Sequence, residues 1–258
     1  MKKMNLGDTR PLEQPSEFSR RESLVRLVFY LNEQLPADTL TFKGGLFLGE
    51  YTGKPRYTQD VDASILSQSG YAMVRNALQS FGEQLVEEGV IARYEIKDDV
   101  VEGRSGGAKY YDSKDRVALS IDISLHGGTP LDTMVMDTSI AGQLRLTTIE
   151  QIVCDKLSVC FTRSRFRRAK DLYDLWLILQ SCTPNVAKVR ELLAQRESYP
   201  LPVEKAPFRD DCIVQMEHAY NKFVLRDPYS ETEQDKPDFK EVVRVTSGFM
   251  SKFMRDDT

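Results

Sequence analysis

Lys43-Gly44-Gly45, followed after a short gap by Arg56-Tyr57-Thr58-Gln59-Asp60-Val61-Asp62, is the most informative part of the sequence. A glycine turn lets backbone N–H groups approach a phosphate closely. Alternate side chains of a strand share a face, so Asp60 and Asp62 are predicted to point together, with Thr58 continuing the row. Magnesium is usually held by one or two carboxylates together with substrate phosphates. The combination therefore indicates nucleotide chemistry, although an isolated Asp-Val-Asp is more often a solvated strand end.

A third acidic residue, Asp122, lies in the run from Arg116 to Leu125, which is rich in β-branched and apolar residues and is followed by Gly127-Gly128. Such a run predicts a buried strand. Because a buried charge is costly unless it is paired or bound to metal, Asp122 is expected to have a partner. The alternative is a strand-end Asp in a turn or a salt bridge.

Lys156 lies in a helix predicted from its start signal and its apolar spacing. Thr147-Thr148-Ile149-Glu150 has the form of a capping box, and Leu157 and Cys160 belong to the apolar stripe that follows. Lys156 falls on this stripe. A lysine there either reaches back to the surface or extends its ammonium into a polar site at the edge of the core, where a compact cation suits phosphate.

The next predicted helix contains Lys170-Asp171-Leu172-Tyr173-Asp174-Leu175. Asp171 lies four residues before Leu175 and so close to the core-facing stripe, whereas Asp174 is predicted to be offset from it. Spacing alone does not choose between the two acids. A surface Asp171 paired with Arg167 or Arg168 is the alternative.

A basic run from Arg163 to Lys170 precedes these acids. It would supply phosphate contacts for RNA or a nucleotide, with Phe166 available to stack on a base. Charge runs are also commonly solvated surface, and that interpretation stays open.

These motifs, in this order, resemble the nucleotidyltransferase superfamily with a palm of the DNA polymerase beta type. More closely, they look like the AbiEii/AbiGii toxin family, which includes the MenT toxins. The resemblance rests on Lys43-Gly44-Gly45, Arg56 to Asp62, Glu150 to Lys156, and Lys170 to Leu175. It implies a metal-dependent nucleotidyltransferase of a toxin–antitoxin or phage-defence system. Such an enzyme transfers NMP from an NTP, usually to the 3′ end of tRNA, and is paired with an antitoxin.

The resemblance also implies roles for individual residues. It implies that the metal ion, magnesium or manganese, binds to Asp60, Asp62 and Asp122. Asp122 would alternatively activate the attacking hydroxyl. It also implies that the triphosphate contacts Lys43, Gly44, Gly45, Arg56, Thr58 and Lys156. The alternative for Lys43 and Arg56 is that they form structural salt bridges. Asp171 would orient or activate a catalytic group, which gives the predicted catalytic set Asp60, Asp62, Asp122, Lys156 and Asp171.

Composition is that of an ordinary globular protein. The 258 residues are 41% hydrophobic and 29% charged, and 35 Lys plus Arg against 39 Asp plus Glu give a net charge of −4. Without a global basic field, RNA binding would depend on a local patch. No apolar run approaches a membrane span or the centre of a signal peptide, so no membrane contact and a cytoplasmic location are expected. The four cysteines lack metal-ligand spacing and are expected to be reduced.

The predicted fold class is α+β, with a nucleotidyltransferase-like mixed-sheet lobe over residues 1–146 and a helical lobe over 147–258 that completes the active site. Helices are expected at 24–35 and 74–85. Strands are expected at 39–42, 60–66, 91–97, 109–111 and 116–125. The segment Gly103-Arg104-Ser105-Gly106-Gly107 is interpreted as a hairpin connection rather than a second phosphate loop.

The residues alone do not identify the molecule that accepts the transferred nucleotide. A small-molecule or protein hydroxyl would use the same metal site, and a non-catalytic nucleotide-binding module is a third alternative.

Overall fold

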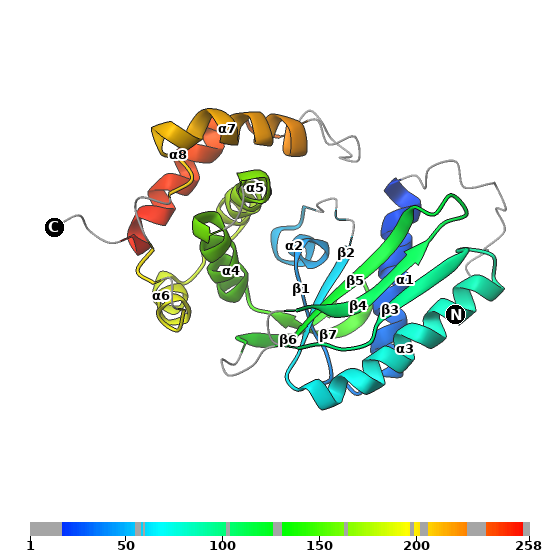
Figure 1. Ribbon diagram of the computed structural model, residues 1–258. Coiled ribbons are helices and arrows are strands. Elements are labelled where there is room, and N and C mark those ends of the chain that lie inside the picture. The colour runs from blue at the N-terminus through cyan, green and yellow to red at the C-terminus, as the bar shows by residue number, and fades with distance from the viewer. Residues whose placement is uncertain are drawn as a thin grey trace.

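The computed structural model describes residues 17–54, 58, 60–101, 104–125, 131–162, 165–196, 199–201, 206–225 and 236–254. Figure 1 shows a sheet with long helices along one face and a separate group of helices formed by the C-terminal half of the chain. This arrangement confirms the predicted α+β class with a mixed sheet.

The sheet has seven strands in the order β3-β4-β5-β2-β1-β7-β6. β2 pairs in parallel with β5, and β1 pairs in parallel with β7, while the remaining neighbours are antiparallel. The strands are β1 (Thr41–Lys43), β2 (Asp60–Ile65), β3 (Arg93–Lys97), β4 (Gly106–Tyr111), β5 (Val117–Leu125), β6 (Thr133–Thr138) and β7 (Gly142–Thr147).

Alternation along the central strands separates the core from an open polar face. Val61 and Ala63 of β2, with Ile121 and Ile123 of β5, are buried in one hydrophobic cluster with residues of α1 (Glu17–Gln34) and α3 (Gln68–Glu87). Because successive side chains of a strand point to opposite faces, the acids of β2 and β5 lie on the other face. The sheet thus buries one side and presents the predicted site residues on the other.

A second hydrophobic cluster begins at Ile152 and is built by the C-terminal helices, with Leu48 from α2 (Gly45–Thr52) added to it. The first cluster ends at Leu146. Two cores accord with a boundary near residue 147, but α2 contributes to both, so the two-domain division stays a prediction. The C-terminal elements are α4 (Ile149–Thr162), α5 (Arg165–Ser181), α6 (Val186–Ala194), α7 (Asp210–Tyr220), a π-helical turn (Asn221–Leu225), α8 (Phe239–Met250) and a 3₁₀ turn (Ser251–Phe253).

The sequence patterns did not predict α2 or the β6–β7 hairpin. α2 is short and buries Leu46, Phe47 and Leu48 in succession, so it lacks the one-sided spacing typical of a surface helix. β3 and β4 are antiparallel neighbours, as the hairpin interpretation requires, but Gly106 and Gly107 belong to β4 itself.

Two further expectations concern the whole chain. All four cysteines are free, as predicted. Among the residues that the structure describes, no helix is both long and apolar enough to cross a membrane.

Candidate active site

The predicted acids lie in one row across the sheet. Asp62 of β2 is in register with Lys43 of β1 on one side and with Asp122 of β5 on the other. The row continues through Gly107 of β4 to Lys97 of β3. Register partners lie on the same face of a sheet, so backbone pairing brings together two acids that are far apart in sequence. Asp60 joins this face because it precedes Asp62 by two positions.

Asp60 and Asp62 form a close pair of like charges. Thr58 Oγ1 donates a hydrogen bond of 3.0 Å to Asp60 Oδ1, which holds the first carboxylate at the start of β2. The pKa of Asp62 is raised to about 6, mainly by burial, then by repulsion from Asp60 and, more weakly, from Asp122. The Lys43 and Lys156 ammonium groups act in the opposite direction on this pKa. Burial and the neighbouring acids therefore outweigh the two ammonium groups in their effect on the pKa of Asp62.

Gly44 lies directly against the Asp62 carboxylate. A Cβ at Gly44 would stand 2.2 Å from Asp62 Oδ2, and the φ of 83° is one that L side chains rarely adopt. Gly44 is also the N-cap of α2, which begins at Gly45. The first backbone N–H groups of a helix have no intrahelical partner and favour anions. The predicted glycine turn is thus a helix N-terminus beside the acid pair.

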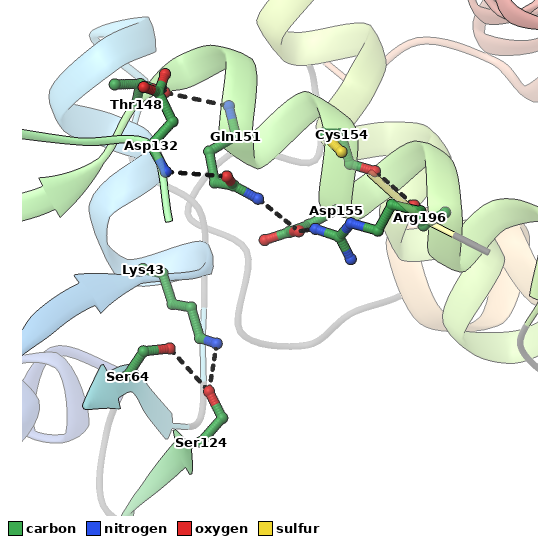
Figure 2. A network of polar contacts seen from close by, with 10 residues as sticks. Lys43, Ser64, Ser124, Asp132, Thr148, Gln151, Cys154, Asp155 and Arg196 are labelled. Carbon is green, nitrogen blue, oxygen red and sulfur yellow. Dashed lines mark hydrogen bonds and ion pairs between the residues drawn. The ribbon is translucent and has the colours of Figure 1, made fainter. Parts of the chain in front are cut away.

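Lys43, the last residue of β1, lies on the same face and in register with Asp62 of β2. Its Nζ donates a hydrogen bond of 2.7 Å to Ser124 Oγ, and the Ser64 and Ser124 hydroxyls are 2.8 Å apart. Figure 2 shows Lys43 of β1 reaching Ser124 of β5, which in turn contacts Ser64 of β2. The contact holds the ammonium at the two serines, two positions along the strands from Asp62 and Asp122, and leaves its predicted role as a phosphate ligand untested.

Asp122 has a partner that the sequence did not reveal. Its Oδ1 accepts a hydrogen bond of 3.0 Å from Lys97 Nζ, and Ser105 Oγ lies 3.4 Å from the same oxygen. The expectation of a buried charge is wrong, because the Asp122 side chain is 47% exposed on the open face while Ile121 and Ile123 enter the core. The period-two pattern Arg93-Tyr94-Glu95-Ile96-Lys97 was the available signal, since it places Lys97 on a polar face.

Lys156 lies between the two candidate acids of α5. Its Nζ is 2.6 Å from Asp171 Oδ1 and 2.6 Å from Asp174 Oδ2. The Lys156 side chain is 17% exposed, so it does not reach back to the surface, and Asp171 at 13% is not a solvent-facing acid. Together the three groups form a nearly buried charge cluster.

The prediction that Asp174 is offset from the buried face is wrong, because its side chain is completely buried. α5 packs against α4, α7 and α8, and also against α2. Its buried surface is therefore wider than the single stripe through Leu172 and Leu175.

Polar contacts at the start of α4 fix the helix that carries Lys156. Thr148 Oγ1 donates to Asp132 Oδ2 (2.7 Å), and Gln151 accepts from the Asp132 N–H (3.1 Å). Gln151 also donates to Asp155 Oδ1 (3.0 Å), which in turn pairs with Arg196 beyond α6. Figure 2 shows this chain running from the β6 side of the sheet along α4. It anchors Lys156 relative to the sheet, consistent with the effect of Lys156 on the pKa of Asp62.

A divalent metal such as magnesium requires hard oxygen donors that lie close together. In the described part of the chain, no three His, Cys, Asp or Glu side chains are arranged to hold a metal ion. Asp60 and Asp62 alone fit an ion shared with substrate phosphates, because they supply two hard oxygen donors on one face and their charges repel. The assignment of Asp122 as a third ligand stays a prediction.

Some predicted residues lie outside the described residues. Arg56 is one of them, as are Arg163 and Ser164 of the basic run, and only the backbone is described from Arg165 to Arg167. Arg168 and Lys170 are both partly buried.

Comparisons with known proteins identify the family of this chain. The family described as "Nucleotidyl transferase AbiEii toxin, Type IV TA system" matches residues 26–245. JHP933 from Helicobacter pylori has a similar structure (TM-score 0.52, 18% identity, 90% of each chain covered). So does MenT4, a nucleotidyltransferase toxin from Mycobacterium tuberculosis H37Rv (TM-score 0.51, 16% identity, 93% of this chain and 94% of that chain). No curated protein sequence matches. The structural likenesses show the fold, and the family match spans most of the sequence, so this chain is a nucleotidyltransferase that belongs to the AbiEii toxin family of toxin–antitoxin systems.

Proposed function

We propose that the chain transfers a nucleoside monophosphate from a nucleoside triphosphate to the 3′ end of tRNA, in a reaction that depends on a divalent metal ion. The observation that carries the proposal is the row in which Asp62 and Asp122 are in register, with Asp60 on the same face and Gly44 against Asp62. Acids, a helix N-terminus and the Lys156 ammonium converge there, as transfer of a charged phosphoryl group requires.

The triphosphate would bind between α2 and α4. The N–H groups that follow Gly44 suit phosphate oxygens, and the Lys156 ammonium, which lowers the pKa of Asp62, supplies positive charge nearby. Asp171 and Asp174 fix the Lys156 ammonium in position. Pre-positioned charges of this kind stabilise a transition state without reorganisation during the reaction.

Asp60 and Asp62 would hold the divalent ion, magnesium or manganese. When bound, such an ion neutralises negative charge on the phosphates and on the leaving pyrophosphate. Asp62 must be deprotonated for this role, and the Lys43 and Lys156 ammonium groups favour that state. Asp122 faces the same space and is the candidate to orient the attacking hydroxyl or to accept its proton.

The proposal of tRNA as acceptor is supported by the resemblance of the motifs and by local positive charge. Lys109 lies on the polar face of the sheet, and Arg168 and Lys170 lie beside Asp171 on α5. Because the chain as a whole is acidic, contacts to an RNA backbone would have to come from such local groups. A cognate antitoxin is the second proposed partner, from the family alone.

Incubation with each of the four α-³²P-labelled nucleoside triphosphates, magnesium, total tRNA and a protein extract tests the acceptor. Label at the tRNA 3′ end is the expected result, and it should disappear with Asp60→Ala. Label in a small molecule or in protein would identify another class of acceptor. Equal labelling by wild type and Asp60→Ala would remove Asp60 from the catalytic set.

A further inference from the structure

Lys97 reaches Asp122 across an intervening strand. Lys97 ends β3, Asp122 lies in β5, and the residue in register between them is Gly107 of β4. Two strand spacings correspond to about 10 Å between backbones. Nevertheless the Lys97 Nζ is 3.0 Å from Asp122 Oδ1, and 3.2 Å from Ser105 Oγ. The missing side chain at Gly107 leaves the path open.

The gap at Gly107 is built into the backbone. Its φ of +119° is unfavourable for other residues, and a Cβ there would stand 2.0 Å from the Ile121 carbonyl oxygen. The hydroxyl of Tyr71, a buried side chain of α3, accepts a hydrogen bond from the Gly107 N–H and donates one to the Lys97 carbonyl, each 2.7 Å long. Tyr71 therefore joins the backbone of Lys97 to that of Gly107, the residue that the Lys97 side chain crosses to reach Asp122.

The two groups of acids in the row thus differ in their counter-charges. Asp122 already has an ammonium on one carboxylate oxygen, and both side chains of this pair stay accessible, with 40% of Lys97 and 47% of Asp122 exposed. Asp60 and Asp62 instead place two carboxylates on one face of β2, two positions apart. A cation from solution therefore gains more at Asp60 and Asp62 than at Asp122, where it would have to displace Lys97.

We infer that Lys97 serves as a built-in counter-cation for Asp122, so that a divalent ion binds this chain through Asp60 and Asp62 and not through Asp122. The inference deepens the proposed function and rests on its metal dependence. Lys97 is a positioning residue that holds Asp122 on the site face, available to the acceptor hydroxyl. The protein itself then supplies the positive charge beside Asp122, through the Lys97 ammonium, and a second metal ion does not.

Direct Mn²⁺ binding to the nucleotide-free protein, followed by the electron paramagnetic resonance signal of the free ion, tests the inference without reference to turnover. Asp122→Asn is expected to leave the Mn²⁺ dissociation constant within about twofold of wild type. Lys97→Met is expected to lower it about fivefold, the scale of an accessible ion pair, because Asp122 becomes available as a ligand. The double variant Lys97→Met/Asp122→Asn is expected to lose that gain.

Two control variants isolate the effect of this pair from general charge effects. Lys109→Met removes a lysine from the same face. Lys109 lies in β4 two positions after Gly107, opposite Ser120 of β5, and its loss should change Mn²⁺ affinity less than twofold. Lys97→Arg keeps a cation at the position and should bind Mn²⁺ as wild type does. If Asp122→Asn weakens Mn²⁺ binding as strongly as Asp62→Asn, or if Lys97→Met binds no better than Lys109→Met, the inference is overturned.

The same titrations separate this inference from the proposed function. Unchanged Mn²⁺ binding by both Asp60→Asn and Asp62→Asn would contradict the proposed metal site itself. Strong loss in those two variants together with strong loss in Asp122→Asn would support the metal site and contradict only the role of Lys97.

Discussion

Lys156 Nζ lies 2.6 Å from Oδ2 of Asp174, a carboxylate with no exposed surface. The same ammonium is 2.6 Å from Asp171 Oδ1, and it affects the pKa of Asp62 across the site. Lys156 therefore has two separable roles: it neutralises a buried acid in the helical core, and it presents positive charge to the site. A loss of activity on mutation would not by itself distinguish them.

Lys156→Met is expected to lower the free energy of unfolding by about 3 kcal/mol, because it leaves Asp174 charged and buried without its ammonium. Transfer activity should be lost in the same variant. Urea unfolding followed by circular dichroism measures the first effect, and tRNA labelling measures the second.

The double variant Lys156→Met/Asp174→Leu separates the two roles. Removing both buried charges should recover most of the lost stability, since an apolar pair can replace a buried ion pair with little cost. Activity should stay absent, because no cation faces the phosphates. A stable double variant that labels tRNA at the wild-type rate would show that Lys156 is only structural.

Asp171 and Asp174 should respond differently to the same isosteric change. Asp174→Asn alters a completely buried group and is expected to cost about 2 kcal/mol of stability. Asp171→Asn, at the partly accessible side of the cluster, should cost less than about 1 kcal/mol and instead lower kcat about tenfold or more. Comparing unfolding free energies with kcat and KM for both variants tests this order. A larger kcat loss in Asp174→Asn would assign the site acid to Asp174.

The sequence predicted those site residues whose grouping follows from local pattern or from the family motifs. Asp60 and Asp62 share a face because a strand has a period of two, and Asp122 lies in a strand recognisable from its composition. Their in-register contact depends on β2 and β5 being parallel neighbours, which no local pattern specifies. The family resemblance supplied that step.

Lys97 and the burial of Asp174 escaped prediction for the same physical reason. Both depend on which elements become neighbours: Lys97 meets Asp122 only because Gly107 stands between them in β4, and Asp174 is buried because α5 is covered on several sides. α2 escaped because nearly all its side chains are buried, which removes the periodicity that marks a helix.

Gly44→Ala should abolish transfer and destabilise the protein by roughly 1–3 kcal/mol. The added Cβ would combine an unfavourable φ of 83° with a clash at 2.2 Å against Asp62 Oδ2. Gly53→Ala is the matched control, since Gly53 also has a positive φ (68°) at the other end of α2 but its Cβ would meet nothing within 4 Å. This control should lose stability and retain kcat. Equal kcat losses in the two variants, measured well below their melting temperatures, would show that the glycine matters for folding alone.

Asp62→Asn should stabilise the metal-free protein at neutral pH. The pKa of Asp62 is raised to about 6, mainly by burial and then by Asp60, so the folded state binds this proton more tightly than the unfolded chain, whose Asp pKa is about 3.9. Wild-type stability from this group therefore decreases as pH increases from about 4 to about 6. The variant should be more stable by roughly 1–2 kcal/mol above pH 7 and nearly equal to wild type near pH 4.

Urea unfolding at pH 4.5, 6 and 8 in the presence of a chelator measures this difference, with Asp122→Asn as the control. Asp122 is paired with Lys97, so its removal should give no gain at pH 8. Addition of Mg²⁺ at pH 8 should stabilise wild type and not Asp62→Asn, because a ligand that binds only the folded state raises its stability. The contrary result is a metal-free Asp62→Asn protein that is less stable than wild type at pH 8. It would mean that groups of the protein already compensate the negative charge of Asp62, so that no cation is needed between Asp60 and Asp62.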